Sequence, residues 1–378
     1  MIPRKLFEED HNFFRDTVKK FAENEIVPHL EEWDEAGGVD RKLWNTLGEM
    51  GFLCTNIDEA YNGAGCDRLF SMILLEELAP YGGLGISIAM HSDIVAPYIQ
   101  RYGSEELKQK YLPKMVSGEL IGALAMTEPG AGSDVKAIRT TAVKDGEHYI
   151  INGSKIFISN GYESGVVVVV AKTDPSAGAK GVSLFVIDES MAGFEKGNKL
   201  KKIGMKAQDT AELFFNDMRV PVENLLGEEN KGFFYLMDEL PWERLQIAIS
   251  AVACAQDAYD RTVAYTKERL VFGKTVASFQ NSKFKLAEMK SEIQIAQVFV
   301  DRCMELVLER KLDAETVSMA KYWCSDLQCK VVDECVQLHG GYGYMQEYPV
   351  ARAWVDARAQ RIYGGTNEIM KELISRGI

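Results

Sequence analysis

A tyrosine and two adjacent glycines stand near the C-terminus, in the run RIYGGTNEIM from Arg361 to Met370. Tyr363, Gly364 and Gly365 precede a short helical pattern, an arrangement typical of an active-site turn. A glycine pair offers backbone groups but no side chain, so the acid, base or nucleophile of such a turn must be sought elsewhere. The turn therefore raises the question of what chemistry the glycines permit.

A glycine-rich segment, AMTEPGAGSDV, spans residues 125–135. Gly130, Gly132 and Ser133 offer backbone N–H groups and one hydroxyl, which suit a phosphate or the edge of a cofactor ring. The segment is not a Rossmann fingerprint, because Val135 stands where a third glycine is required and no βαβ unit surrounds it. A tight structural turn explains these residues equally well.

A second segment, NGSKIFISNG at 152–161, places Phe157 and Ser159 two residues apart. On a strand, both side chains would point to one face. An aromatic plane beside a hydroxyl suits a planar conjugated ring. A half-buried strand has the same periodicity, so both interpretations stay open.

Three further motifs lie at the ends of long helical patterns. ERLVFGK (268–274) carries Arg269, which suits either a helix C-terminus or a pyrophosphate. QLHGGYGY (337–344) has three glycines, which permit close approach to a ligand or form a C-cap. ELPWERLQIA (239–248) is expected to begin the first long helix. Glu243 would then lie in the first turn of that helix, where the helix dipole stabilises a negative charge, or it would form an ion pair with Arg244.

Histidine and cysteine spacing argues against a metal site. The five histidines form no HExxH pair, and the seven cysteines form no CxxC pair. The cysteines are scattered through apolar helical patterns, so we expect reduced core residues in a cytoplasmic compartment. No metal is therefore predicted.

Composition excludes several classes of partner. The 378 residues carry 56 acidic and 43 basic side chains, a formal charge of -13, which argues against nucleic-acid binding. The first 30 residues show no signal or transit pattern, and no stretch approaches the roughly 20 apolar residues of a membrane span. These features predict a cytoplasmic protein with a small-molecule partner.

The chain divides into three regions by its periodicity. Apolar residues recur at helical intervals over 1–121, and short β-branched or aromatic runs such as GVVVVVAKT fill 122–225 with an Asp145-Gly146 hairpin signal. Over 226–378 helical patterns return and are long. We therefore expect an α+β fold, mainly α, with an N-terminal helical domain, a central antiparallel β-barrel-like domain and a C-terminal four-helix bundle. The predicted bundle seam is Leu286, Met289, Ile293, Ala296, Val300, Cys303 and Val307.

Taken in chain order, TEPGAGSD, NGSKIFISNG, ERLVFGK, QLHGGYGY and IYGGTNEIM resemble the acyl-CoA dehydrogenase family over essentially the whole chain. The family's three-domain fold matches the layout inferred from periodicity. The resemblance implies an FAD enzyme that oxidises an acyl-CoA to a trans-2-enoyl-CoA, by loss of a proton from Cα and a hydride from Cβ. It also implies a homotetramer, with electron-transfer flavoprotein as electron acceptor.

The resemblance implies roles for individual residues. Residues along the flavin would be Leu124, Met126, Thr127, Phe157 and Ser159, while Ser133 would touch both flavin and acyl-CoA. Residues that reach the FAD of a neighbouring subunit would be Arg269, Phe272, Gln280 and the stretch from Gln337 through Gly340 to Gly341. Thr366 and Glu368 would contact the dinucleotide, and Arg244, Tyr363 and Gly365 would lie at the substrate.

Many members of the family have a glutamate base directly after the tyrosine, where this chain has Gly364. Long-chain and isovaleryl members instead carry a glutamate on the first long helix of the bundle, and ELPWERL supplies Glu243 at that position. Gly364 would leave room for this carboxylate, and its N–H would bind the thioester carbonyl and stabilise the developing enolate. Burial is expected to raise the pKa of Glu243.

ELPWERL, Phe157 and the C-terminal segment EYPVARAW look closest to the long-chain members of the family. Branched short-chain substrates such as isovaleryl-CoA are the alternative. An acyl-CoA oxidase, a DNA-associated flavoprotein and a nitroalkane-oxidising relative share the fold and remain further alternatives.

Overall fold

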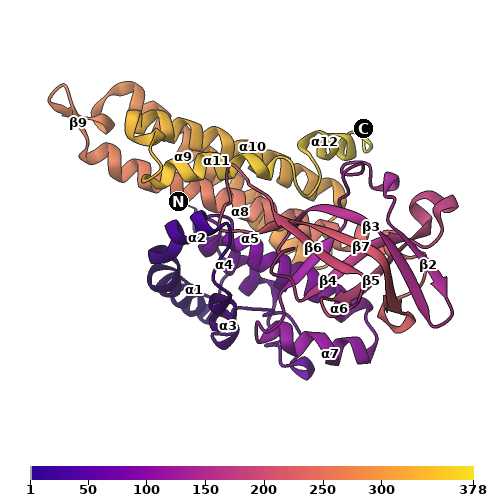
Figure 1. The fold of residues 1–378 in the computed structure, drawn as a ribbon. Helices are drawn as coiled ribbons and strands as arrows, with labels where there is room; N and C mark the ends of the chain where they lie inside the picture. Colours follow the sequence, from indigo (N-terminus) through magenta and orange to yellow (C-terminus); the bar gives the residue numbers. More distant parts are fainter. Residues whose placement is uncertain (1) are drawn as a thin grey trace.

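The computed structural model describes residues 2–378, in which helices, a sheet and a second set of helices follow one another along the chain (Figure 1). Among the residues described, the first helices are α1 (Glu9–Phe21), α2 (Leu30–Ala36), α3 (Arg41–Glu49), α4 (Arg68–Leu78), α5 (Leu84–Ala89), α6 (Ala96–Tyr102) and α7 (Glu105–Val116). A π-helical segment, η4 (Met90–Val95), joins α5 to α6 without a break. This first region is helical, as its periodicity predicts.

The central sheet is mixed. Its strands are β1 (Gly122–Ala125), β2 (Thr141–Asp145), β3 (His148–Ser159), β4 (Val166–Lys172), β5 (Val182–Asp188), β6 (Phe194–Lys199), β7 (Thr210–Pro221) and β8 (Leu225–Leu226). The strand order is β6-β7-β3-β2-β4-β5-β8, with β1 on β4. Most pairs are antiparallel, but β1 and β2 both pair with β4 in parallel. The predicted hairpin is confirmed, since Asp145 pairs with His148 around Gly146 at φ 58°.

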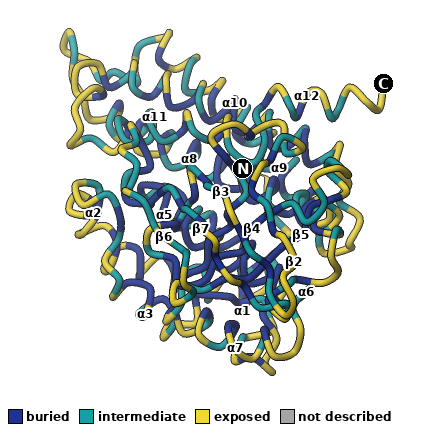
Figure 2. Tube along the Cα trace, turned by 45° about the vertical axis from the view of Figure 1, so that its right-hand side comes forward, coloured by how far each residue is buried: buried dark blue, intermediate teal, exposed yellow. Residues whose placement is uncertain are grey.

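The run of valines in β4 is buried on both faces of the sheet. Side chains alternate along a strand. Val166, Val168 and Val170 join the core shared with the N-terminal helices. Val167 and Val169 join the separate core between the strands. Strand β4 is therefore buried inside the molecule, where the tube in Figure 2 is dark.

The C-terminal helices form a bundle that packs directly against helices α4 and α5 of the first region, with the sheet to one side (Figure 1). They are α8 (Gly232–Glu268), α9 (Gln280–Leu308), α10 (Ala314–His339), α11 (Pro349–Gln360) and α12 (Asn367–Ser375), with a small hairpin of β9 (Leu270–Val271) and β10 (Lys274–Thr275) between α8 and α9. The predicted seam is confirmed, because its five central residues are buried and its two end residues, Leu286 and Val307, pack against them.

Two helix boundaries differ from the sequence prediction. Helix α8 begins at Gly232 and runs through Pro241, so the expected start near Trp242 is wrong. Buried Leu236 packs into the N-terminal core, and this contact outweighs the helix-breaking tendency of the proline. The second long pattern is also broken, because the chain leaves α9 through Arg310 at φ 56°, without any Gly or Pro.

The predicted domain limits at 121/122 and 225/226 stay a prediction. The first falls between α7 and β1, and the second falls inside the two-residue strand β8. Across residues 2–378, no helix is both long enough and apolar enough to span a membrane.

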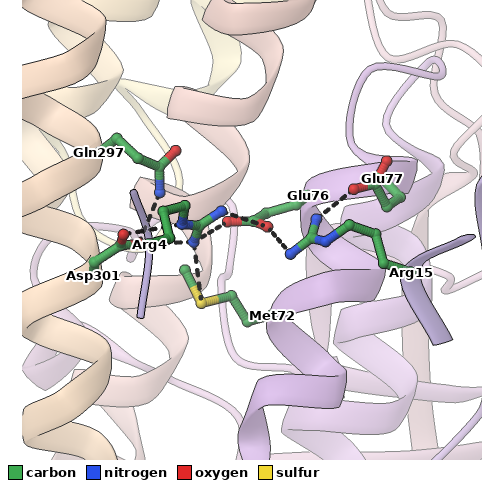
Figure 3. A network of polar contacts seen from close by, with 7 residues as sticks. All are labelled: Arg4, Arg15, Met72, Glu76, Glu77, Gln297 and Asp301. Atoms are coloured by element: carbon green, nitrogen blue, oxygen red, sulfur yellow. Dashed lines mark hydrogen bonds and ion pairs between the residues drawn. The ribbon is translucent and has the colours of Figure 1, made fainter. Parts of the chain in front are cut away.

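A charged network ties the N-terminal segment to two distant helices (Figure 3). The Arg4 guanidinium binds Glu76 of α4 at 2.7 Å and Asp301 of α9 at 2.7 Å. Arg15 of α1 binds the other oxygen of Glu76 at 2.7 Å and also contacts Glu77. Since Glu76 is only 9% exposed, this network holds partly buried charges together across the first and last regions of the chain.

We expect Arg4→Met to lower the free energy of unfolding by roughly 2–4 kcal/mol, because it leaves partly buried Asp301 without its cation and removes one of the two on Glu76. Thermal melts of the FAD-loaded protein would measure the loss. Lys5→Met, at an exposed neighbouring position, is the matched control and should leave the melting temperature within experimental error. Equal melting temperatures for both variants would show that the network contributes no net stability.

Candidate active site

Glu243 lies in the interior of α8, about three turns after its first residue. The interpretation as a first-turn acid is therefore wrong. Its side chain is mostly buried, and Tyr98 of α6 donates a hydrogen bond to its Oε1 at 3.1 Å. Burial raises the pKa of Glu243 to about 7, although the Tyr98 hydroxyl lowers it. A carboxylate with such a pKa suits proton abstraction near neutral pH.

The glycine turn packs directly against the face of α8 that carries Glu243. Gly364 has φ 67° and Gly365 has φ 92°, conformations that side chains rarely adopt. A Cβ on Gly364 would overlap the Cδ1 atom of Ile247, which lies one helical turn after Glu243. Ile247 thus fills the space that a side chain at position 364 would need.

Polar groups hold the turn from both sides. Arg244 donates from Nε to the Gly364 carbonyl at 3.3 Å, and buried Lys321 of α10 donates to the Gly365 carbonyl at 2.8 Å. Lys321 also binds Asn367, the first residue of α12, and Thr366 caps that helix through its hydroxyl. The carbonyls are therefore engaged. The Gly364 N–H has no acceptor within residues 2–378, and it remains available to a ligand.

The glycine-rich loop between β1 and β2 is open and rests on a buried ion pair. A Cβ on Gly130 or Gly132 would meet no atom within 4 Å, and Ser133 is exposed. Beneath the loop, Lys155 of β3 binds Glu128 at 2.9 Å, with Lys155 fully buried. Burial lowers the pKa of Lys155 to about 8, while Glu128 opposes that shift. The ion pair fixes the loop while its glycines and serine face solvent.

We expect Lys155→Met to reduce FAD retention at least tenfold, because Glu128 would become a buried carboxylate without its cation and the loop would shift. Flavin absorbance per polypeptide after gel filtration would measure the retention. Lys144→Met, on the exposed part of β2, is the control and should retain flavin as the wild type does. Retention equal to wild type in Lys155→Met would contradict a role of the ion pair in shaping this loop.

Phe157 does not continue a regular strand. It has φ 60°, the pairing of β3 with β7 shifts between Lys155 and Ile158, and the Phe157 ring is 65% exposed. The pairing of β3 with β7 therefore contains a bulge between Lys155 and Ile158, and a shared face for Phe157 and Ser159 stays a prediction. An exposed ring held out by a strained backbone provides a flat apolar surface for a planar ligand.

A second set of predicted residues lies at the far end of the bundle. A groove of about 570 Å³ is lined by Tyr265, Arg269, Val271, Val276, Tyr342, Met345 and the stretch 337–341. It includes the predicted Gln337, Gly340 and Gly341, and Phe272 beside it is 96% exposed. Lys321 and His339 stand 18 residues apart on α10, about 27 Å along the helix. Figure 1 accordingly shows β9 and α12 at opposite ends of the bundle, so one chain presents the groove and the glycine turn as separate places.

The remaining predicted residues divide between these places. Leu124 is buried, and Met126 and Thr127 are half-buried, where β1 runs into the open loop. Gln280 begins α9 outside the groove lining, and exposed Glu368 stands in the first turn of α12. The hydroxyl of Tyr363 is buried without a partner within residues 2–378, and burial raises its pKa, with smaller effects of Cys254 and Asp356. Cys254 stands 11 residues after Glu243 on α8, so the hydroxyl is directed away from the carboxylate.

The structure also brings in residues that sequence reasoning missed, namely Tyr98, Ile247, Lys155, Glu128 and Lys321. Only Ile247 carried a signal in sequence, since its spacing of four from Glu243 puts both on one helical face. The others reach the site from elements far away in the chain. Metal-ligand clusters are absent from residues 2–378.

Glu243 and the glycine turn thus lie on neighbouring elements of the bundle, joined by the Arg244 hydrogen bond and the Ile247 contact. The chain belongs to the acyl-CoA dehydrogenase family, because models of that family's N-terminal, middle and C-terminal domains match residues 8–119, 123–218 and 230–378.

Individual relatives agree with this assignment. The chain is 54% identical to the long-chain specific acyl-CoA dehydrogenase, mitochondrial, of Sus scrofa, over 99% of this chain and 88% of that protein. An acyl-CoA dehydrogenase structure from Geobacillus kaustophilus superposes with a TM-score of 0.97 and 49% identity, covering 99% of each chain. A glutaryl-CoA dehydrogenase from Mycobacterium smegmatis, solved in complex with FADH2, superposes at 0.93 with 28% identity over 99% of this chain and 95% of that one.

The family's cofactor is FAD, and the residues present fit it. Open glycine positions at 130, 132, 340 and 341 leave room for a dinucleotide backbone, since an added Cβ there meets no atom within 4 Å. Arg269 near one glycine pair would supply a cation for a pyrophosphate, and the exposed Phe157 ring would supply a flat surface. The chain is thus an oxidoreductase with FAD as cofactor.

Proposed function

We propose that the enzyme oxidises long-chain saturated acyl-CoA thioesters to trans-2-enoyl-CoA, with Glu243 as the base. The observation that carries this proposal is the placement of Glu243. Its carboxylate, with a pKa of about 7, lies one turn from the Ile247 side chain that packs under Gly364. A base delivered from α8 replaces the side chain that Gly364 lacks.

In the proposed reaction, Glu243 takes the proton from the carbon next to the thioester carbonyl. The Gly364 N–H donates to that carbonyl oxygen and stabilises the enolate that develops as the proton leaves. Bound FAD supplies a hydride acceptor for the neighbouring carbon. Arg244 and Lys321 hold the turn through its carbonyls, so the N–H keeps its direction during the reaction.

The preference for a long chain is supported by the 54% identity to an enzyme named for long-chain substrates. Anaerobic mixing of the FAD-loaded protein with butyryl-, octanoyl-, palmitoyl- or isovaleryl-CoA would test it, with flavin bleaching as the readout. We expect kcat/KM for palmitoyl-CoA to exceed that for butyryl- and isovaleryl-CoA at least roughly tenfold, because each additional buried methylene adds binding energy. The highest value with isovaleryl-CoA would favour a branched-chain enzyme, and no bleaching with any thioester would overturn the proposal.

We also propose electron-transfer flavoprotein as the acceptor. The seven cysteines are free, and no metal cluster was found across residues 2–378, so a second redox centre would have to come from a partner. Fast reoxidation of the bleached flavin by oxygen would instead favour the oxidase alternative.

We further propose a homotetramer in which the groove at 337–341 of one copy holds part of the cofactor of another. The exposed side chains around it, including Phe272 at 96%, support an interface there. A cytoplasmic location stays a proposal. The free cysteines support a reducing compartment, whereas the relative from Sus scrofa is named as mitochondrial.

A further inference from the structure

Tyr98 is a fully buried tyrosine whose hydroxyl meets Glu243. It lies on α6, three residues after the end of the π-helical segment η4, and its ring belongs to the core of the N-terminal helices. The hydroxyl donates to Glu243 Oε1 at 3.1 Å, and this is its one hydrogen bond within residues 2–378. A phenylalanine would fill the same apolar space without a buried hydroxyl to satisfy, so packing alone does not explain the tyrosine.

The bond selects one oxygen of the carboxylate. Tyr98 engages Oε1, and Oε2 has no hydrogen-bond partner within residues 2–378. A carboxylate held through one oxygen has a fixed rotation about its terminal torsion, which is otherwise broad. The free oxygen is then the one able to accept a proton from a substrate.

Several charged or titratable groups face Glu243. From α8 itself, Glu239 raises its pKa and Arg244 lowers it, and from α6 Tyr98 lowers it against the effect of burial. Glu239 is itself paired with the Arg101 guanidinium, at 2.5 Å, and the Tyr102 hydroxyl donates to the same oxygen at 3.1 Å. The guanidinium of Arg68, on α4, lies over the ring of Trp242. Burial lowers the pKa of Arg68, and the charge of Glu239 opposes that shift. Among these groups, Tyr98 is the one hydrogen-bonded to the Glu243 carboxylate.

We propose that Tyr98 is the positioning residue of the reaction, which orients the Glu243 carboxylate through a hydrogen bond to Oε1. This inference rests on the proposed role of Glu243 as base. Tyr98 does not touch the reacting carbons, and it acts only through the carboxylate. Its contribution should therefore be visible in the pH dependence of proton abstraction rather than in substrate affinity.

The test is the pH profile of anaerobic flavin bleaching by palmitoyl-CoA in Tyr98→Phe. A hydrogen bond to a charged group stabilises the ionised form, so its loss should move the acidic limb of kcat/KM up by about one pH unit. At a pH below that limb the rate should fall roughly tenfold and recover at high pH, with KM nearly unchanged. Flavin content should match the wild type, because the ring and its packing are kept.

Tyr102→Phe is the matched control. Tyr102 lies one turn after Tyr98 on α6, and its hydroxyl binds Asp238 and Glu239 instead of Glu243. Its profile should stay within about 0.3 pH units of wild type, because it acts on Glu243 only through Glu239. A wild-type profile in Tyr98→Phe, or the same shift in both variants, would overturn the inference.

Glu243→Gln measured alongside separates this inference from the proposed function. If Glu243→Gln bleaches as the wild type does, Glu243 is not the base and both proposals fall. If Glu243→Gln is inactive and Tyr98→Phe keeps the wild-type profile, only the role of Tyr98 is wrong. Inactivity of the first with a shifted profile of the second supports both.

Discussion

Glu243→Gln is expected to bleach at least about 10³-fold more slowly than the wild type with palmitoyl-CoA, the largest loss we anticipate for any single substitution. Positioned general bases contribute roughly 10²–10⁴-fold, and an amide of the same shape cannot accept the proton. The Tyr98 hydroxyl can still donate to the amide oxygen, so the helix and its packing should be kept. Stopped-flow absorbance under anaerobic conditions measures the rate.

Glu239→Gln is the control for that experiment. Glu239 lies one turn before Glu243 on the same helix and is also largely inaccessible, at 3% exposed, but its carboxylate binds Arg101 and Tyr102. Its replacement should cost less than about tenfold in rate, because it removes only a neighbouring charge. Equal losses in both variants would mean that the effect at Glu243 is structural.

Stability provides an independent check on the same variant. The pKa of Glu243 is raised from 4.5 to about 7 in the folded protein. The native state therefore binds a proton more tightly than the unfolded chain, and stability falls as pH rises from about 4.5 to 7. Above that range the buried charge costs up to about 3 kcal/mol, so Glu243→Gln should melt at a higher temperature than wild type at pH 8 and at the same temperature near pH 4. A lower melting temperature at pH 8 would contradict burial of the ionised carboxylate.

Gly364→Glu is expected to lower kcat/KM by roughly 10²–10³-fold, although it restores the residue that many relatives carry at this position. A Cβ there would overlap Ile247, and the backbone at φ 67° is unfavourable for a side chain. The overlap and the unfavourable backbone would each move the N–H that we propose donates to the thioester carbonyl. Loss of one such donor lowers kcat by about 10²–10³-fold. Bleaching rates with palmitoyl-CoA measure the change.

Removing Ile247 tests that explanation directly. In the background Glu243→Gln with Gly364→Glu, the further change Ile247→Ala should raise the bleaching rate at least roughly tenfold, because the new carboxylate gains the space that Ile247 occupied. Ile249→Ala is the control, since Ile249 is also buried on α8 but does not contact Gly364. Equal rates with both additions would show that Ile247 does not set the position of the base.

The order of elements follows from the sequence, and so does the position of Glu243 on the first long helix of the bundle, because periodicity and motif order are local properties of the chain. The start of α8 did not, since Pro241 looks like a boundary while the burial of Leu236 extends the helix through it. The end of α9 could not be predicted either, because no glycine or proline marks it. Arg310 adopts a left-handed conformation without either.

The residues that support the site could not be predicted from the sequence, because their partners lie far away along the chain. Tyr98 and Glu243 are separated by 145 positions, and Lys321 and Gly365 by 44. No pattern along the chain distinguishes Tyr98 from Tyr102, which differ only in the carboxylate that each one meets. The spacing of Phe157 and Ser159 is compatible with a regular strand, and nothing in the sequence marks the bulge next to Phe157. Only the shift in strand pairing reveals it.

The Arg4 network has a consequence for the order in which the protein acquires its structure. Arg4 is synthesised before Asp301, which follows 297 positions later. At about 5–20 residues per second, a ribosome needs roughly 15–60 s to travel between them. During that interval the nascent N-terminal segment lacks one of its two partner helices. The contact between Arg4 and Asp301 therefore closes only after α9 has been synthesised, so the N-terminal segment docks fully late in folding.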